Sequence, residues 1–94
     1  HPAQAGAVNA LRLSGTSVLY DNGYYGSCIL RSKEIFRVEP SLADRIDARF
    51  RVADALEKMR LREEAYDAYA ALVPEDLSPA QRKLVVGKLE TLKK

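Results

Sequence analysis

The sequence predicts an all-α domain of about five helices. Hydrophobic residues recur at spacings of three and four, the period of one helix face. Five Gly and four Pro in 94 residues are too few for the many turns of a β sandwich or barrel. Charged residues make up 30% of the chain and hydrophobic residues 47%, which suits helices with one buried and one solvated face. We expect residues 1–94 to form one domain.

The first two helices are predicted over residues 5–20 and 25–38. The first ends at Asp-Asn-Gly, because Asn and Gly tolerate the left-handed conformation that terminates a helix. The second ends before Pro40, since a residue preceding proline is disfavoured in the helical region. The buried positions predicted for the first helix are Val8, Leu11, Gly15 and Val18. Those predicted for the second are Tyr25, Cys28, Ile29, Ser32, Ile35 and Phe36.

The third helix is predicted from a capping box at Ser41 and Asp44 to about Arg60. A tight corner follows, and the fourth helix covers about residues 63–72. Buried or half-buried positions predicted for the third helix are Ile46, Phe50, Ala53, Leu56 and Met59. Those predicted for the fourth are Ala65, Ala68, Tyr69 and Leu72, an i, i+3, i+4, i+7 pattern.

The last helix begins with a start signal of Ser78 as the cap, proline at the first helical position and Gln81 three residues after the cap. It extends to about residue 92, with Val85, Leu89 and Leu92 directed inward. The loops between the five helices are short, so consecutive helices are expected to be antiparallel neighbours.

Charge is unevenly distributed although the net charge is only +2. Residues 52–77 carry −4 and residues 78–94 carry +4, so we expect the two segments to complement each other in the fold. The alternative is that the basic last helix binds a nucleic acid or an anionic surface. Its segment has no aromatic residue for base stacking, which disfavours that alternative. Its cations are Arg82, Lys83, Lys88, Lys93 and Lys94.

Residues that carry catalysis are scarce. His1 is the one histidine and Cys28 the one cysteine, so a catalytic triad, a Cys-His pair and a metal site are poorly supplied. The glycines match no phosphate-binding loop. We therefore expect no enzyme activity, no cofactor and no small-molecule substrate. No apolar run approaches the roughly 20 residues of a membrane span. The lack of disulfides fits a reducing cytosol and is also compatible with a periplasmic domain.

An internal repeat is the strongest pattern in the chain. Residues 53–72, ADALEKMRLREEAYDAYAAL, place a small residue, a large one three later, a turn, then Ala65 with an aromatic four later. This segment resembles the tetratricopeptide repeat family. Residues 11–40 resemble it in the same way, with the closing proline at 40. Departures are Ser14 for a large apolar residue, Cys28 for alanine, Arg60 for the turn glycine and an early Pro74.

The resemblance implies a right-handed superhelix of antiparallel helix pairs. The first repeat would cover about 8–41, the second about 46–77 and a capping helix about 79–93. Small residues would sit where paired helices cross, with Gly15 or Ala53 facing Cys28 or Ala65. Two repeats are fewer than the three such arrays usually need. The chain would then be part of a longer array, pair with itself, or need a partner, as small secretion chaperones resembling this fold do.

The resemblance further implies a scaffold or adaptor that binds a peptide or helix of another protein on its concave face. Phe50 and Leu13 would be the apolar contacts, although Phe50 packing under the last helix is an alternative. The slots that bind a carboxylate tail in co-chaperones hold Asn9, Leu13, Asp47 and Arg51, which lack the required Asn–Lys set. Rival roles are a structural or self-associating array segment and an anionic-surface binder. The predicted partner-binding residues are Leu13, Tyr20, Asp47, Phe50, Arg51, Asp54, Lys58 and Lys88.

Overall fold

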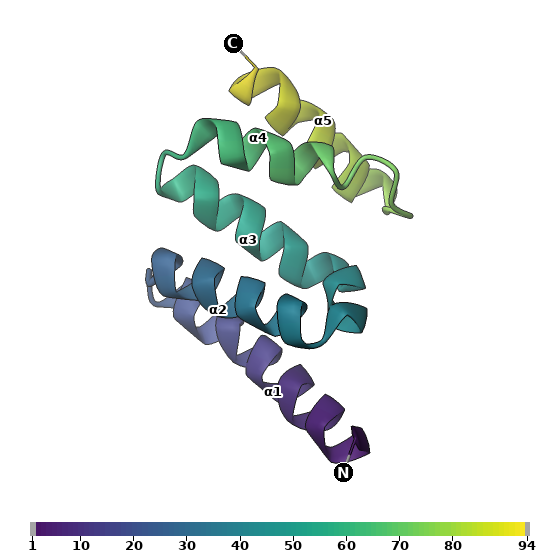
Figure 1. Ribbon diagram of the computed structural model, residues 1–94. Helices are drawn as coiled ribbons and strands as arrows, with labels where there is room; N and C mark the ends of the chain where they lie inside the picture. Colours follow the sequence, from purple (N-terminus) through teal and green to yellow (C-terminus); the bar gives the residue numbers. More distant parts are fainter. Residues whose placement is uncertain (1, 94) are drawn as a thin grey trace.

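The computed structural model in Figure 1 describes residues 2–93 and the side chains of residues 8–93. Over residues 2–93 the chain is helical and contains no strand, so the prediction of an all-α fold is confirmed. The elements are α1 (Pro2–Asp21), α2 (Tyr25–Val38), the 3-10 helix η1 (Pro40–Asp44), α3 (Ile46–Lys58), α4 (Arg62–Ala70) and α5 (Pro79–Leu92).

The helices are stacked in chain order along the long axis of the molecule, which measures 46 × 27 × 19 Å. Each α-helix packs against the next, and α1 also reaches α3. In Figure 1 the chain reverses direction at every connection, and the α1–α2 and α3–α4 corners lie on the same side of the stack. None of the helices described is both long enough and apolar enough to cross a membrane.

The start of α5 follows the sequence prediction. The Gln81 backbone N–H donates to Ser78 Oγ at 3.1 Å, and the Ser78 N–H donates to Gln81 Oε1 at 2.9 Å. This reciprocal capping box satisfies two backbone donors that the first turn of a helix leaves without a partner. The predicted bounds of α2 and the end of α5 at Leu92 also agree with the structure.

The capping box predicted at Ser41 and Asp44 is wrong. Residues 40–44 form η1, and α3 begins only at Ile46, where the preceding residue Arg45 provides no side-chain cap. Pro40 fixes a tight turn in which the Leu42 N–H donates to the Glu39 carbonyl at 3.0 Å. Within this turn the Ser41 hydroxyl donates to the Glu39 carboxylate at 3.3 Å. The start signal therefore belongs to the short connector and not to α3.

The apolar core is divided into two clusters of buried residues. The larger joins α2 to α5, and Ala53 and Ala65 are fully buried in it, as the repeat pattern predicted for the second helix pair. The smaller cluster joins α1 to α2 and α3 through Leu13, Ile35 and Ala48. The larger cluster contains Ile29, Val52, Ala53, Ala55, Leu56, Ala65, Tyr69, Leu72, Leu77, Val85 and Leu92.

The buried face predicted for α1 is wrong. Its large members are mostly exposed, at 53% for Val8, 72% for Leu11 and 60% for Val18. A methyl group built on Gly15 would meet nothing within 4 Å, so Gly15 marks no close approach of helices. Met59, predicted to be at least half-buried in the third helix, is also exposed. The face of α1 that is buried carries Asn9, Leu13 and Thr16.

Both faces of α1 have helical spacing, so periodicity alone does not choose between them. Thr16 can be buried because its hydroxyl donates to the Leu13 carbonyl at 2.6 Å, within the helix itself. The same hydroxyl oxygen accepts from the Arg51 guanidinium on α3 at 3.2 Å. These bonds remove the cost of burying a polar group, and the more polar face of α1 therefore packs inward.

Candidate functional site

A hollow of about 330 Å³ crosses four of the helices, and we refer to it as the α1–α5 groove. It brings together five of the eight predicted partner-binding residues. Leu84 and Tyr69 complete its lining. The lining residues are Tyr20 from α1, Phe50, Arg51 and Asp54 from α3, Tyr69 from α4, and Leu84 and Lys88 from α5.

The floor of the groove is aromatic. The Phe50 and Tyr69 rings meet edge to face, with centroids 6.5 Å apart and an interplanar angle of 65°. Tyr69 is fully buried, whereas Phe50 is half-buried against the core and still lines the groove. Phe50 therefore packs against the core cluster, which includes Val85 and Leu92 of α5, and it also faces the hollow. Leu84 on α5 is 47% exposed and extends this apolar surface.

One wall is a hydrogen-bonded pair of side chains from α1 and α3. The Tyr20 hydroxyl donates to Asp54 Oδ2, and the Tyr20 ring packs edge-on against Tyr25 with centroids 5.5 Å apart. The hydrogen bond to Asp54, together with burial, raises the pKa of Tyr20 to about 12. Lys58 lies outside the groove, with its Nζ 4.0 Å from Asp54 Oδ2.

Alkaline pH should destabilise the fold through this pair. The folded-state pKa of Tyr20 lies above the unfolded value of 10.0, so the folded state retains a proton that the unfolded state has lost. The contribution of this pair to the free energy of unfolding is therefore fully present below pH 10, and it is lost as the pH rises toward 12. Urea unfolding measured across this range should show the decline, and Tyr20→Phe should reduce its slope. An unchanged slope in Tyr20→Phe would contradict the assignment to Tyr20.

Lys88, which lines the groove from α5, forms an ion pair with Glu57 of α3, which lies outside the lining. Lys88 Nζ lies 2.8 Å from Glu57 Oε1, and the Tyr69 hydroxyl donates to the same oxygen at 3.4 Å. Burial and the nearby carboxylates of Asp54 and Glu57 raise the pKa of Tyr69. Glu57 was not predicted from the sequence. Its position three residues after Asp54, on the same face of α3, is the signal that could have indicated it.

Leu13 and Arg51 mainly make contacts inside the fold. Leu13 is only 1% exposed, so it lies in the core and does not line the groove. Arg51 Nη2 donates to Thr16 Oγ1 at 3.2 Å and lies 3.4 Å from the Leu13 carbonyl, which ties α1 to α3. Beside this guanidinium lies buried Cys28, whose pKa is raised by its burial and lowered in part by Arg51.

Asp47 does not line the groove either. Its exposed carboxylate lies 3.6 Å from Arg45 and 3.9 Å from Arg51, at the start of α3. Both contacts are ion pairs at the surface, where water screens the charges. The structure thus places Tyr20, Phe50, Arg51, Asp54 and Lys88 together, and it places Leu13, Asp47 and Lys58 outside the hollow.

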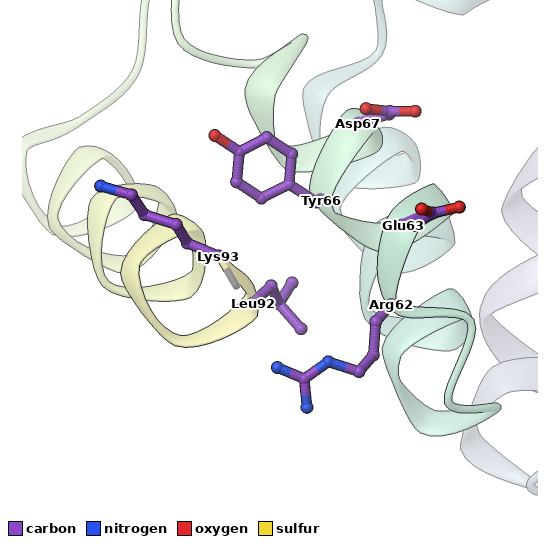
Figure 2. A pocket seen from close by; sticks show the side chains of 6 residues that line it. All are labelled: Arg62, Glu63, Tyr66, Asp67, Leu92 and Lys93. Atoms are coloured by element: carbon purple, nitrogen blue, oxygen red, sulfur yellow. The ribbon is translucent and has the colours of Figure 1, made fainter.

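A second hollow of about 640 Å³ lies between α4 and the end of α5. Figure 2 shows Tyr66 and Arg62 extending from α4 on either side of Leu92. No sequence pattern indicated this pocket, because it combines residues of two helices, both exposed and buried. Its remaining lining residues are Glu63, Asp67 and Lys93. Across the described side chains, no cluster of three or more metal-ligating residues could hold a metal ion.

The basic last segment is partly used within the fold. Lys88 pairs with Glu57 across the helix interface, which agrees with the expected complementarity of segments 52–77 and 78–94. Arg82 donates to the backbone carbonyls of Val73 and Glu75 at 3.1 and 2.9 Å. These contacts fix the loop before α5. Lys83 and Lys93 are exposed, and Lys94 lies outside the described residues.

Comparison of the chain with protein-family models, with curated proteins and with solved structures finds no match.

Proposed function

We propose that this domain is a non-catalytic scaffold that holds a peptide or helix of a partner protein in the α1–α5 groove. The observation that carries the proposal is an apolar floor of Phe50, Tyr69 and Leu84 framed by charged side chains from two helices. Aromatic residues surrounded by polar groups are the usual energetic centre of a protein interface. A hollow of about 330 Å³ has room for one or two side chains of a partner.

We also propose that the helices form a tetratricopeptide-like superhelix, with the groove on its concave side. Two observations support this arrangement. Each helix packs against its successor and reverses direction (Figure 1). Ala53 and Ala65, which the repeat pattern places at the crossing of α3 and α4, have no exposed surface. Helix pairs of this kind stack into curved arrays when each pair buries the apolar face of the next.

The charged side chains of Lys88 and Asp54 would orient the ligand, and they would add less to its affinity than the apolar floor does. Lys88 is held by Glu57 at 2.8 Å, and Asp54 accepts from Tyr20. Both charges are therefore positioned before a partner arrives, which lowers the entropy lost on binding. An apolar side chain of the partner would rest on Phe50 and Leu84, while its polar groups would meet Lys88 and Asp54.

Removing the floor should weaken partner binding while the helices remain folded. We expect the double variant Phe50→Ala/Leu84→Ala to lower affinity by about tenfold or more, because both side chains face the hollow. Partners would be isolated from the native host with the wild-type domain, and each affinity measured by calorimetry. Leu30→Ala is the matched control, since Leu30 is exposed on α2 away from the groove.

The proposal fails if the double variant, shown to be folded by circular dichroism, binds as tightly as the wild-type domain. A rival role is favoured by the exposed apolar face of α1, namely Val8, Leu11 and Val18. That face would suit a self-associating or structural segment of a longer helical array. Sedimentation at several concentrations separates the two roles, because a stable monomer disfavours self-association.

A further inference from the structure

Two corners of the fold share one backbone motif but differ in one residue. At the α1–α2 corner the Gly23 N–H donates to the Tyr20 carbonyl at 3.0 Å and the Tyr24 N–H to the Leu19 carbonyl at 2.8 Å. At the α3–α4 corner the Arg60 N–H donates to the Glu57 carbonyl at 2.9 Å and the Leu61 N–H to the Leu56 carbonyl at 3.0 Å. Both are Schellman motifs, which require a left-handed residue after the helix.

Glycine occupies that position at the first corner and arginine at the second. Gly23 has φ of +81° and Arg60 has φ of +63°, and Arg60 is the only non-glycine residue with positive φ in the described chain. A side chain in the left-handed region costs free energy that glycine avoids. Glycine at position 60 would thus adopt the same corner at a lower conformational free energy. Unfavourable backbone conformations of this kind are concentrated at functional positions.

Arg60 lines a pocket of about 390 Å³ together with two further cations. The pocket lies where the α3–α4 corner meets the end of α5. Its carboxylate, Glu57, is already engaged by Lys88 at 2.8 Å and by the Tyr69 hydroxyl. The lining therefore holds three cations and one acidic group, and Lys58 also lies 4.0 Å from Asp54 Oδ2 outside the pocket. The lining residues are Glu57, Lys58, Arg60, Arg62, Thr91 and Leu92.

Arg62 is held in place before any ligand binds. Its Nη2 donates to the Thr91 backbone carbonyl on α5 at 3.2 Å. In Figure 2 its guanidinium extends past Leu92, away from the Tyr66 ring. Arg62 is also the first residue of α4, and the preceding Leu61 provides no side-chain cap. The backbone donors of this first turn lie at the same corner, together with the carboxylates of Glu63 and Glu64, which offset part of their positive potential.

We propose that Lys58, Arg60 and Arg62 form a binding site for a phosphate-type dianion. Two guanidinium groups present paired N–H donors that match the oxygens of a tetrahedral oxyanion, and the lysine adds a mobile charge. The shared ligand chemistry is a phosphate group, either free phosphate or the phosphate monoester of a phosphorylated side chain. This site is separate from the α1–α5 groove, since none of the three cations lines that groove.

The test uses the full chain and two probes, inorganic phosphate and a Gly-phosphoserine-Gly peptide, followed by NMR titration of backbone amides. We expect a Kd on the order of 1 mM, with shifts centred on residues 58–62. Arg60→Gly should weaken phosphate binding by about tenfold, because a bidentate charged donor is lost. The same variant should unfold at a higher temperature, since glycine fits the left-handed corner. Loss of binding therefore could not be attributed to loss of folding.

Three comparisons make the outcome decisive. Arg60→Lys should retain part of the affinity, and Arg37→Gln, a charge removed from α2 outside the pocket, should retain all of it. The groove variant Phe50→Ala/Leu84→Ala should bind phosphate as the wild-type chain does, whatever happens to partner binding. Tighter binding of the phosphopeptide supports a phosphorylated side chain as the ligand, and equal binding supports free phosphate. Wild-type affinity in Arg60→Gly, or shifts spread over all surface cations, would overturn the proposal.

Discussion

Replacing Tyr69 with alanine is expected to lower the free energy of unfolding by about 3–5 kcal/mol, the cost of truncating a large core aromatic. Tyr69 is 1% exposed and belongs to the larger core cluster. Its ring supports Phe50, and its hydroxyl reaches Glu57. Small domains are stable by only about 5–15 kcal/mol, so this loss should consume a large share of the stability. Urea denaturation followed by far-UV circular dichroism measures it.

Tyr69→Phe separates the ring from the hydroxyl. The ring keeps its packing in this variant, and Glu57 keeps its ion pair with Lys88. The expected loss is therefore only about 1 kcal/mol, the net worth of one hydrogen bond. If the phenylalanine variant were as unstable as the alanine variant, the hydroxyl and not the packing of the ring would be holding this part of the core.

Replacing Ala53 with leucine should destabilise the fold by about 1–3 kcal/mol, because the larger side chain has no space. Ala53 on α3 and Ala65 on α4 are both fully buried in the same core cluster. A leucine at position 53 would force these helices apart or displace neighbouring side chains. Thermal unfolding should show a lower midpoint, and Ala65→Leu should behave similarly.

Gly15→Ala is the matched control, and its expected effect has the opposite sign. Gly15 lies inside α1 with open space around it, so a methyl group would meet nothing and would raise helix propensity. A gain of about 0.5–1 kcal/mol is expected. A loss at Gly15, or no change at Ala53, would show that the helices approach at different points from those described.

Local chemistry explains which elements were predictable. The prediction of where α5 starts was correct because the cap, the proline and the glutamine lie within four consecutive residues. The prediction of which face of α1 is buried was wrong because that face is selected by a contact with a residue distant in sequence. Thr16 is buried through its bond with Arg51, 35 residues later, and no periodicity in α1 reports that contact. The capping box predicted at Ser41 was also wrong, because Pro40 begins the 3-10 helix η1 at this position.

The candidate site was predicted in part. Tyr20, Phe50, Arg51, Asp54 and Lys88 were assigned to one surface through the resemblance to a repeat family, and the structure gathers them around one hollow. Leu13 lies two turns before Tyr20 on α1 but is buried in the core. The depth at which a helix sits decides between lining a groove and being buried, and spacing carries no information on depth. The sequence indicated Arg60 only as the residue that replaces the turn glycine of the repeat.

The unequal division of the core has a consequence for how the molecule opens. Among the described side chains of α1, Leu13 is the one fully buried apolar residue, and the other contacts of α1 include the Thr16–Arg51 and Tyr20–Asp54 hydrogen bonds and the Tyr20–Tyr25 ring contact. Such a helix should detach as a separate unit at a lower free energy than global unfolding requires. Amide protons should then exchange with solvent soonest in residues 8–20 and last around residues 53–69, so that the stack frays from its beginning.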